Sequence, residues 1–312
     1  MNLRAWFVSF TPATLISSFV SVTLGTALAW YLSNSFNPMI YAITLIALLL
    51  AQGGVNLVHD YYDYLSGVDL LYRASGFSHK RHPIIDLNLS PRSVLAAGYV
   101  FLTVAFMAGI YLFLLVGWPV LALAIAGLII GVGYSVPPLK FHYRGYGEVL
   151  AALAIGPLVT WGSYIVQTGI YTNPAPLIVG LPNGLFTILT LIGAGTLELD
   201  ASRAVGKLTL VLLVGVRRIK YVIYAVITLI YLSIVISAIL HYLPYISLVS
   251  LLLIPRTVRL AGPLLTGDES VVRSRWREVR KLWAGPFSIR LIMLTILVAS
   301  MVIARVYPPL SP

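Results

Sequence analysis

The feature that most constrains this chain is a series of apolar runs, each about as long as a lipid bilayer is thick. A hydrocarbon core of about 30 Å requires roughly 20 apolar residues in one helix. We expect nine membrane-spanning helices, at 11–32, 38–59, 92–115, 118–136, 147–168, 176–199, 219–241, 244–262 and 286–306. Turn residues such as Pro, Gly and Asn separate neighbouring runs. The sequence therefore predicts an all-α, polytopic membrane protein, with residues 1–312 forming one nine-helix domain.

The composition supports this prediction. Hydrophobic residues make up 59% of the 312 residues and charged residues only 10%, whereas soluble domains carry roughly 25% charged residues. The chain contains no cysteine, which excludes thiolate catalysis, disulfides and zinc–thiolate sites.

Charged residues fall on one side of the expected membrane. The loops after the odd-numbered runs, within 31–37, 116–119, 168–176 and 241–243, contain no Lys, Arg, Asp or Glu. The sequence assigns all acids, and all basic residues except Arg305, to the other side. Cytoplasmic loops carry the excess of Lys and Arg, so we expect a multi-pass protein of the cell membrane whose N-terminus and acidic cavity are cytoplasmic. This pattern accounts for the net charge of +11 without a nucleic-acid partner.

The two longest loops, 60–91 and 262–285, lie on the charged side. The second loop is basic and interleaved with Trp; it contains Arg273, Arg275, Arg277, Arg280 and Lys281. This pattern is typical of an interfacial helix that lies on anionic headgroups. The alternative is a basic lid over an anionic ligand.

Acids occur where two of the apolar runs end. Asp60 and Asp63 are three residues apart and so share a helix face, with Asn56 one turn earlier. Carboxylates beside hydrocarbon are costly, which makes this cluster a functional hypothesis by default. The alternative is a set of helix-end acids that pair with loop Lys and Arg on a wet surface.

A second stretch repeats this pattern four helices later. Residues 53–60 (GGVNLVHD) align with 193–200 (GAGTLELD), and both combine small residues, a Leu and acids at the charged end. Small residues allow helices to approach closely in lipid. We expect the two halves to face each other across a cavity, with Glu198 and Asp200 opposite Asp60 and Asp63.

Gathered acids without cations would repel one another, and some would take up protons. Several carboxylates with oxygen-only ligands suit Mg²⁺, which usually shares its coordination with substrate phosphates. Nearby cations could neutralise the remaining charge of a diphosphate; they are Lys80, Arg81, Lys140, Arg144, Arg203 and Lys207.

These residues together match the motifs of a known family. Its first motif, Asn-Asp-x-x-Asp followed by a further Asp, is matched by HDYYD at 59–63 and by Asp69. Its second motif, Asp-x-x-x-Asp followed by Arg-x-x-Gly-Lys-x-Thr-Leu, is matched by ELDAS at 198–202 and RAVGKLTL at 203–210. On these motifs the chain resembles the UbiA superfamily of intramembrane aromatic prenyltransferases.

Further stretches are similar to the MenA branch of that superfamily. They are TPATL at 11–15, YSVPPLK at 134–140, RGYGE at 144–148 and GSYIVQTG at 162–169. The MenA branch attaches a polyprenyl chain to 1,4-dihydroxy-2-naphthoate. The resemblance therefore implies a Mg²⁺-dependent prenyltransferase of menaquinone-type quinone biosynthesis, whose partners are a polyprenyl diphosphate, an aromatic acceptor and membrane lipid.

The resemblance also implies roles for individual residues. The metal-binding set is Asp60, Asp63, Asp69, Glu198 and Asp200. The set that binds the polyprenyl diphosphate is Asn56, His59, Tyr134, Lys140, Arg144, Arg203 and Lys207. The catalytic set consists of the five acids and Lys140, a cation that would stabilise the charge developing as the C–O bond breaks. Aromatic faces, that of Tyr134 among them, would stabilise the allylic cation.

Three positions depart from the family pattern. His59 stands where the family has Asn, Glu198 where it has Asp, and Ser202 where the second motif ends in Asp. An imidazole is a softer ligand than an amide oxygen, so we expect His59 to donate a hydrogen bond to phosphate instead of binding metal. Ser202 removes one formal charge and should weaken one of the two Mg²⁺ sites that the resemblance implies.

Other functions are consistent with parts of this pattern. Within the same enzyme class, the acceptor could be 4-hydroxybenzoate, homogentisate, haem or a glycerol lipid. A diverged lipid-binding relative without activity would keep the fold. A cation-coupled transporter also carries membrane acids and pseudo-repeats, but its site tends to lie near the bilayer midplane. The acids here cluster at one face, which argues against a transporter.

Overall fold

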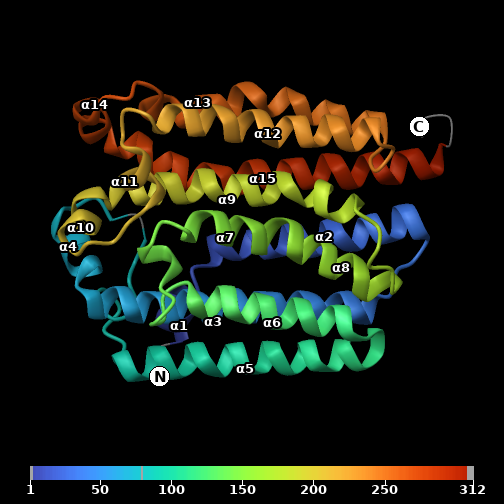
Figure 1. Ribbon diagram of the computed structural model, residues 1–312, viewed down its shortest axis with the longest axis horizontal. Coiled ribbons are helices and arrows are strands. Elements are labelled where there is room, and N and C mark those ends of the chain that lie inside the picture. The colour runs from blue at the N-terminus through green and yellow to red at the C-terminus, as the bar shows by residue number, and fades with distance from the viewer. Residues whose placement is uncertain (1–2, 79, 308–312) are drawn as a thin grey trace.

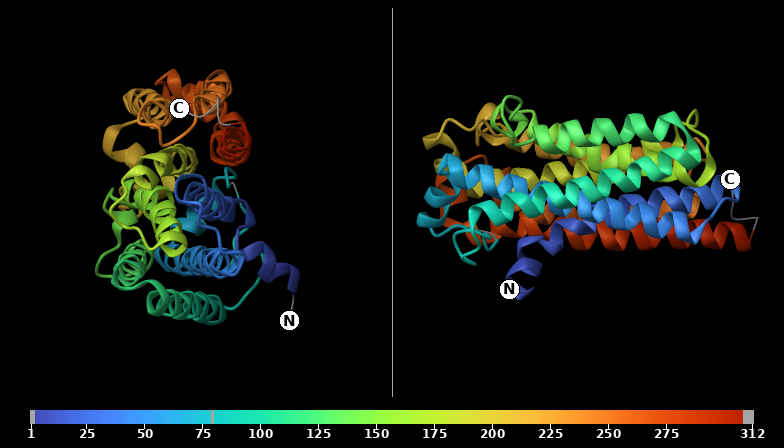
Figure 2. Two further views of the ribbon diagram at one scale, coloured as in Figure 1. Left: turned by 90° about the vertical axis from the view of Figure 1, so that its right-hand side faces the viewer. Right: turned by 90° about the horizontal axis from the view of Figure 1, so that it is seen from below.

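Helices account for all regular elements in the part of the chain that our computed structural model describes, residues 3–78 and 80–307. The long helices lie side by side along the longest axis of the molecule (Figure 1). They are α2 (Pro12–Ser33), α3 (Pro38–Ser66), α5 (Pro91–Val116), α6 (Trp118–Gly133), α9 (Ala175–Leu197), α12 (Ile219–Ile239) and α15 (Trp276–Val306). Seen end-on, they form a bundle (Figure 2).

Two further spans are each built from consecutive helical segments. One consists of α7 (Gly147–Leu153), η2 (Ala154–Leu158) and α8 (Val159–Thr168), and the other of η3 (Tyr245–Leu253) and α13 (Ile254–Leu265). The short helices are α1 (Leu3–Ser9), α4 (Val68–Ala74), η1 (Phe141–Tyr143), α10 (Leu199–Ala204), α11 (Leu210–Val214) and α14 (Glu269–Ser274).

The expected all-α membrane fold is confirmed. Within the described residues, eight helices are long and apolar enough to cross a membrane. The remaining predicted run, 118–136, forms α6, which has only 16 residues. At 1.5 Å per residue this helix is about 24 Å long, which is shorter than a hydrocarbon core of about 30 Å.

Two predicted boundaries were wrong, and both changes place more chain in helices at the charged end. Helix α3 continues past residue 59 as far as Ser66, and ends where Gly67 adopts a left-handed conformation with φ 80°. Helix α15 begins at Trp276 rather than at residue 286. Much of the basic loop 262–285 is therefore part of α13, α14 and α15 instead of one separate interfacial helix.

The span of α7, η2 and α8 contains a π-helical turn at Pro157. Proline removes a backbone donor, and membrane helices tolerate it where other groups bind the freed carbonyls. In addition, the hydroxyl of Ser21 on α2 donates to the carbonyl of Ile155 at 2.5 Å, which attaches this turn to α2. The same turn packs tightly on α9, because a Cβ at Gly156 would lie 2.5 Å from the backbone of Gly184.

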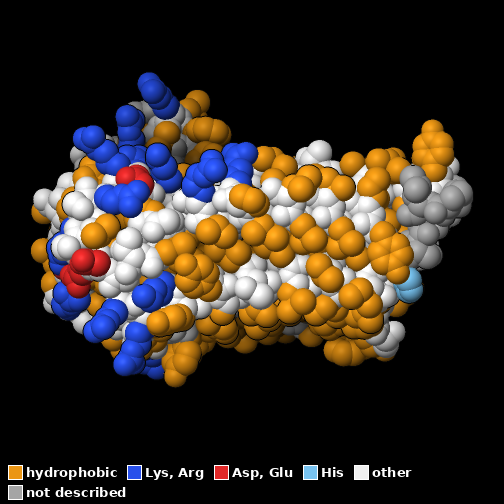
Figure 3. Space-filling model, turned by 90° about the horizontal axis from the view of Figure 1, so that it is seen from above, with side chains coloured by type: hydrophobic (Ala, Val, Ile, Leu, Met, Phe, Trp, Pro, Cys, Tyr) orange, Lys and Arg blue, Asp and Glu red, His pale blue; other side chains and the backbone are white. Residues whose placement is uncertain are grey.

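Charged side chains gather at one end of the bundle. Figure 3 shows Lys and Arg at the end where α4, α10 and α14 lie, and mainly hydrophobic side chains along the rest of that face. This distribution agrees with the predicted asymmetry, with one exception that the sequence assigned wrongly. Arg290 lies inside the bundle on α15, with 1% of its surface exposed.

We predict that Gly156→Ala lowers the free energy of unfolding by about 1–3 kcal/mol, the usual cost of overpacking. The measurement is thermal unfolding of the purified protein in detergent. Gly262→Ala on α13 is the matched control, since a Cβ there meets nothing within 4 Å. It should be neutral or slightly stabilising, because Ala favours helix over Gly. A Gly156→Ala protein that melts no lower than the control would contradict the packing argument.

Candidate active site

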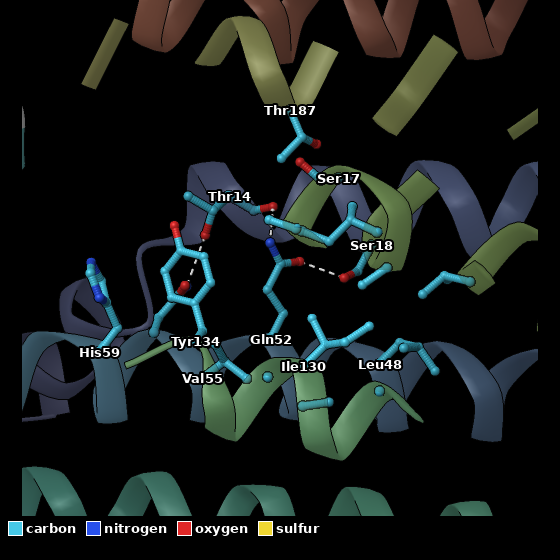
Figure 4. Close-up of a pocket in the computed structure, with 18 of the residues that line it drawn as sticks. Thr14, Ser17, Ser18, Leu48, Gln52, Val55, His59, Ile130, Tyr134 and Thr187 are labelled. Atoms are coloured by element: carbon cyan, nitrogen blue, oxygen red, sulfur yellow. Dashed lines mark hydrogen bonds between the residues drawn. The ribbon is translucent and has the colours of Figure 1, made fainter. Parts of the chain in front are cut away.

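A cavity of about 390 Å³ lies inside the bundle, between α2, α3, α6, α8, α9 and α15. One end is acidic and includes His59, Asp60 and Asp63, while apolar side chains such as Leu48 and Val166 line other parts. Figure 4 shows His59 and Tyr134 in one part of the cavity and Leu48 in another. A cavity with a charged end and an apolar body suits an amphiphilic ligand.

The structure brings four of the five predicted acids together at the charged end. Asp60 and Asp63 belong to α3 and Asp69 belongs to α4, while Glu198 is the single residue between α9 and α10. All four are buried and line the cavity. As predicted, acids from the first half of the chain and Glu198 from the second half line the same cavity.

Lys207 joins the two halves. Its ammonium lies 2.8 Å from Oδ2 of Asp63 and 2.9 Å from Oε1 of Glu198, and no part of its side chain is exposed. Burial by itself would lower the pKa of Lys207, but the two carboxylates raise it well above its ordinary value. The ammonium is therefore charged, and it neutralises acids that would otherwise repel each other.

The backbone around Lys207 holds its ammonium in place. The N–H of Leu208 donates to the carbonyl of Tyr143 at 3.1 Å, and the N–H of Leu210 donates to Oε1 of Glu148 at 2.8 Å. Gly206, with φ 71°, makes the turn that directs the chain back. The loop after α10 is thus attached to η1 and to the first turn of α7.

A second lysine neutralises Asp60. The ammonium of Lys80 lies 2.5 Å from Oδ1 of Asp60. The other carboxylate oxygen, Oδ2, is buried and has no hydrogen-bond partner among the described residues. A buried, unpartnered carboxylate oxygen is costly, so this atom is available for a cation.

His82 organises the loop that follows α4, and sequence reasoning did not identify it. Its Nδ1 accepts hydrogen bonds from the N–H groups of Ile84 (3.1 Å) and Ile85 (3.2 Å). Nε2 must then carry the proton; it lies 2.9 Å from Oδ2 of Asp69 and 3.0 Å from the carbonyl of Asp60. Burial would raise the pKa of Asp69, but the hydrogen bond from His82 lowers it below its ordinary value.

Tyr143 is a second residue that the sequence did not single out. Its hydroxyl donates to Oδ1 of Asp63 at 2.8 Å. Its ring centroid lies 5.1 Å from the ammonium of Lys140 and 5.3 Å from that of Lys207. Its position in the sequence could have identified it, because Tyr143 lies between Lys140 and Arg144, which belong to the two MenA-like stretches at 134–140 and 144–148.

Aromatic rings form one wall of the acidic end. The rings of Tyr134 and His142 stack, with centroids 4.6 Å apart, and the ring of His59 meets that of His142 edge-on at 5.4 Å. Nδ1 of His59 lies 2.9 Å from Oγ of Ser135. Tyr134 therefore lies in an aromatic wall that lines the cavity.

Asp200 does not join the other acids, contrary to our expectation. Half of its side chain is exposed, and it forms an ion pair with Arg273 of α14. Arg273 in turn pairs with Glu269, at 2.7 Å. The physical reason is the break between α9 and α10 at Glu198, which turns Asp200 outward.

Several of the predicted diphosphate-binding cations also lie outside the cavity lining. The exposed Arg144 donates to the carbonyl of Pro138 at 2.8 Å, and Arg203 lies 3.7 Å from Asp200. Asn56 does line the cavity, but its NH₂ group already donates to the carbonyl of Phe10 and to the hydroxyl of Thr14.

Among the described residues, two groups have the spacing of metal ligands. They are Asp60, Asp69 and His82, and His59, Asp63 and His142, and within each group the ligand atoms lie within 4.8 Å of one another. The first group consists mainly of carboxylates and includes Asp60, whose Oδ2 has no hydrogen-bond partner among the described residues. It therefore fits a hard cation that prefers oxygen ligands.

Comparisons with known proteins agree with these features. A profile described as the UbiA prenyltransferase family matches residues 18–284. The chain is similar to UbiA prenyltransferase domain-containing protein 1 of Gallus gallus, with 28% identity over 268 residues, or 84% of this chain and 73% of that protein. It is also similar to the 1,4-dihydroxy-2-naphthoate octaprenyltransferase of Bacillus subtilis (strain 168), with 27% identity over 65% of this chain and 64% of that protein.

Solved structures show the same fold. A UbiA homologue from Aeropyrum pernix K1, in its apo form, aligns over 94% of this chain and 98% of its own with a TM-score of 0.62 at 14% identity. A UbiA homologue from Archaeoglobus fulgidus bound to GPP and Mg²⁺ aligns over 96% and 99% with a TM-score of 0.58, also at 14% identity. The arrangement of the helices is therefore that of these membrane proteins.

We predict that Lys207→Met destabilises the protein, since it leaves two buried carboxylates without their cation. Removing one partner of a buried ion pair costs about 3–5 kcal/mol, so the melting temperature in detergent with EDTA should fall clearly. Lys220→Met is the matched control, because the ammonium of Lys220 lies over the ring of Tyr221 at 5.4 Å, away from these acids. Equal melting temperatures for both variants would show that the ion pairs of Lys207 do not stabilise the fold.

Proposed function

The chain belongs to the UbiA prenyltransferase family, and on that premise we propose that it transfers a polyprenyl group from its diphosphate to an aromatic acceptor. The observation that carries the proposal is the cavity of about 390 Å³, whose acidic end is built from both halves of the bundle. The diphosphate would bind at the acids, and the isoprenoid chain would lie along the apolar wall.

We propose Mg²⁺ as the cofactor. The residues that would hold it are Asp60, Asp63, Asp69 and Glu198, and the unpartnered Oδ2 of Asp60 supports this set. When bound, the metal supplies Lewis-acid neutralisation that makes diphosphate a better leaving group. The solved homologue with GPP and Mg²⁺ supports the choice of metal. Asp200 is left out of this set because it pairs with Arg273.

Lys80, which lines the cavity, would contact the diphosphate, and Lys207 would act through the carboxylates that it holds. Lys80 and Lys207 already bring positive charge to this end of the cavity. As the bond between C1 of the prenyl group and the bridging oxygen breaks, the electron pair leaves with the diphosphate, and fixed cations stabilise that charge. Lys140, Arg144 and Arg203 lie outside the cavity lining and are left out of this set.

The rest of the reaction depends on the aromatic wall and on the exclusion of water. The ring of Tyr134, which lines the cavity, would stabilise an allylic cation. A carbon of the electron-rich acceptor ring forms the new bond to C1, and the ring loses a proton. Apolar side chains near Tyr134, such as Val55 and Ile130, would keep water from intercepting the cation.

For the acceptor, we propose 1,4-dihydroxy-2-naphthoate, which would place the enzyme in menaquinone-type quinone biosynthesis. The support is the similarity to the octaprenyltransferase of Bacillus subtilis, together with the stretches at 134–140 and 162–169. By the excess of Lys and Arg at one end, we further propose a protein of the cell membrane with its N-terminus and acidic cavity on the cytoplasmic side.

We predict that Asp60→Asn and Asp63→Asn each lower prenyl transfer at least about 100-fold, because each removes a ligand charge from the acidic end. Asp200→Asn is the matched control, since it makes the same chemical change on an exposed acid; it should keep most of the activity. Transfer is measured with labelled geranylgeranyl diphosphate, an acceptor panel and mass spectrometry. Loss in Asp200→Asn together with full activity in Asp60→Asn would reverse the assignment.

We also predict that EDTA abolishes transfer and that added Mg²⁺ restores it, because the carboxylates need a cation to accept a diphosphate beside them. The test measures product formation in membranes before and after dialysis against EDTA. Unchanged transfer in excess EDTA would rule out the metal role while leaving a prenyltransferase.

A further inference from the structure

Arg290 is a buried cation without an acidic partner inside the bundle. It lies within the membrane-spanning helix α15 with 1% of its surface exposed, and it lines the cavity. Among the described residues, no carboxylate lies within ion-pair distance of its guanidinium. An unpaired charge at this depth is expensive and marks a functional site by default.

The neighbours of Arg290 accept hydrogen bonds but carry no charge. Nη1 donates to Oγ of Ser17, and Nη2 donates to the hydroxyl oxygens of Thr187 (3.2 Å) and Thr190 (3.3 Å). The two Thr hydroxyls donate their own protons to backbone carbonyls of α9, so towards Arg290 they act as acceptors. Nε has no partner among the described residues. Figure 4 shows Ser17 and Thr187 pointing toward each other at the cavity.

The position of Arg290 separates it from the acids. Thr190 lies on α9, eight residues before Glu198, the residue that follows the helix, and this separation is about 12 Å along the helix. On α3, Gln52 accepts a hydrogen bond from Ser18, the neighbour of Ser17, and it too lies about 12 Å before Asp60. The cavity therefore has two separate polar sites, an acidic one at its end and a cationic one about two helical turns deeper.

We propose that Arg290 binds the carboxylate of the proposed acceptor and thereby determines the preference for a carboxylated ring over the same ring without a carboxylate. This inference rests on the proposed prenyl transfer. A guanidinium presents a planar pair of donors that matches the two oxygens of a carboxylate. Its single positive charge also balances the single negative charge of a carboxylate. The ring of such an acceptor would extend from Arg290 toward Tyr134 and the C1 atom of the donor.

The diphosphate is the wrong anion for this position. It carries more negative charge than a single guanidinium offsets, and its binding at Arg290 would leave the acids about two helical turns away. A phosphate monoester carries up to two negative charges near neutral pH, which also exceeds one guanidinium. A neutral acceptor would leave Arg290 buried and unpaired, and a site with a buried, unpaired group discriminates strongly against such an analogue.

The experiment compares 1,4-dihydroxy-2-naphthoate with 1,4-dihydroxynaphthalene, which is the same ring system without the carboxylate. The proteins are the wild type, Arg290→Met, Arg290→Lys and Arg305→Met, with geranylgeranyl diphosphate as donor. Arg305→Met is the matched control, since Arg305 lies on the same helix and donates to the carbonyls of Trp30 and Tyr31. Thermal unfolding in detergent first establishes that each variant is folded.

In the wild type, kcat/KM should favour the carboxylate acceptor by about 100-fold or more. Arg290→Met should reduce that ratio at least tenfold while the KM for the donor stays the same. Arg290→Lys should keep part of the preference, because it retains the charge but not the planar pair of donors. Arg305→Met should keep the wild-type ratio. A wild type without preference, or an Arg290→Met variant whose ratio is unchanged, overturns the inference.

Binding without turnover separates this inference from the proposed function. The rise in melting temperature caused by the carboxylate acceptor alone, with no donor present, should disappear in Arg290→Met and persist in Arg305→Met. If the wild type transfers no prenyl group to any acceptor but shows this Arg290-dependent rise, the proposed function fails and the carboxylate site stands. If transfer occurs and the rise survives in Arg290→Met, the carboxylate site fails alone.

Discussion

The ion pairs that Lys207 makes with Asp63 and Glu198 are the interaction on which the rest of the site depends. They connect α3 to the junction of α9 and α10, so that one ammonium holds two halves of the chain together. Without that charge, carboxylates from both halves would face each other in an environment with little water, and some would take up protons. The loop contacts at Leu208 and Leu210 serve the same purpose, because they fix the position of the ammonium.

The fold was predictable from the sequence because a bilayer leaves few alternatives. Every backbone polar group in hydrocarbon must be bonded internally, so a long apolar run has to be a helix. The hydropathy of the runs therefore predicted the class of fold, and Asp60 and Asp63 were recognisable because carboxylates are rare beside such runs. The end of α3 was not predictable in the same way. Polar residues after 59 are compatible with either helix or loop, and the helix stops only at Gly67.

The candidate site was predictable only where residues lie on a helix whose direction is known. Asp200 illustrates the limit, because a break of the helix at Glu198 turns it outward to Arg273. His82 and Tyr143 reach Asp69 and Asp63 from loops, and no periodicity in the sequence places a loop residue against a helix. Arg290 was assigned to the charged side by its type, whereas the tertiary packing places it at Ser17 and Thr190.

Helices α3 and α15 are longer than a bilayer requires. At 1.5 Å per residue, the 29 residues of α3 extend about 44 Å and the 31 residues of α15 about 47 Å, against a hydrocarbon core of about 30 Å. Counted from Pro38, the roughly 20 residues that cross the core end before Asp60, so Asp60 and Asp63 lie in the excess of α3 at the charged end, where lipid headgroups would lie. An amphiphile bound there keeps its head and its tail at the depths that they occupy in the free bilayer. Binding of the proposed donor in this way would avoid the work of extraction, which is about 0.8 kcal/mol for every CH₂ group that is exposed to water.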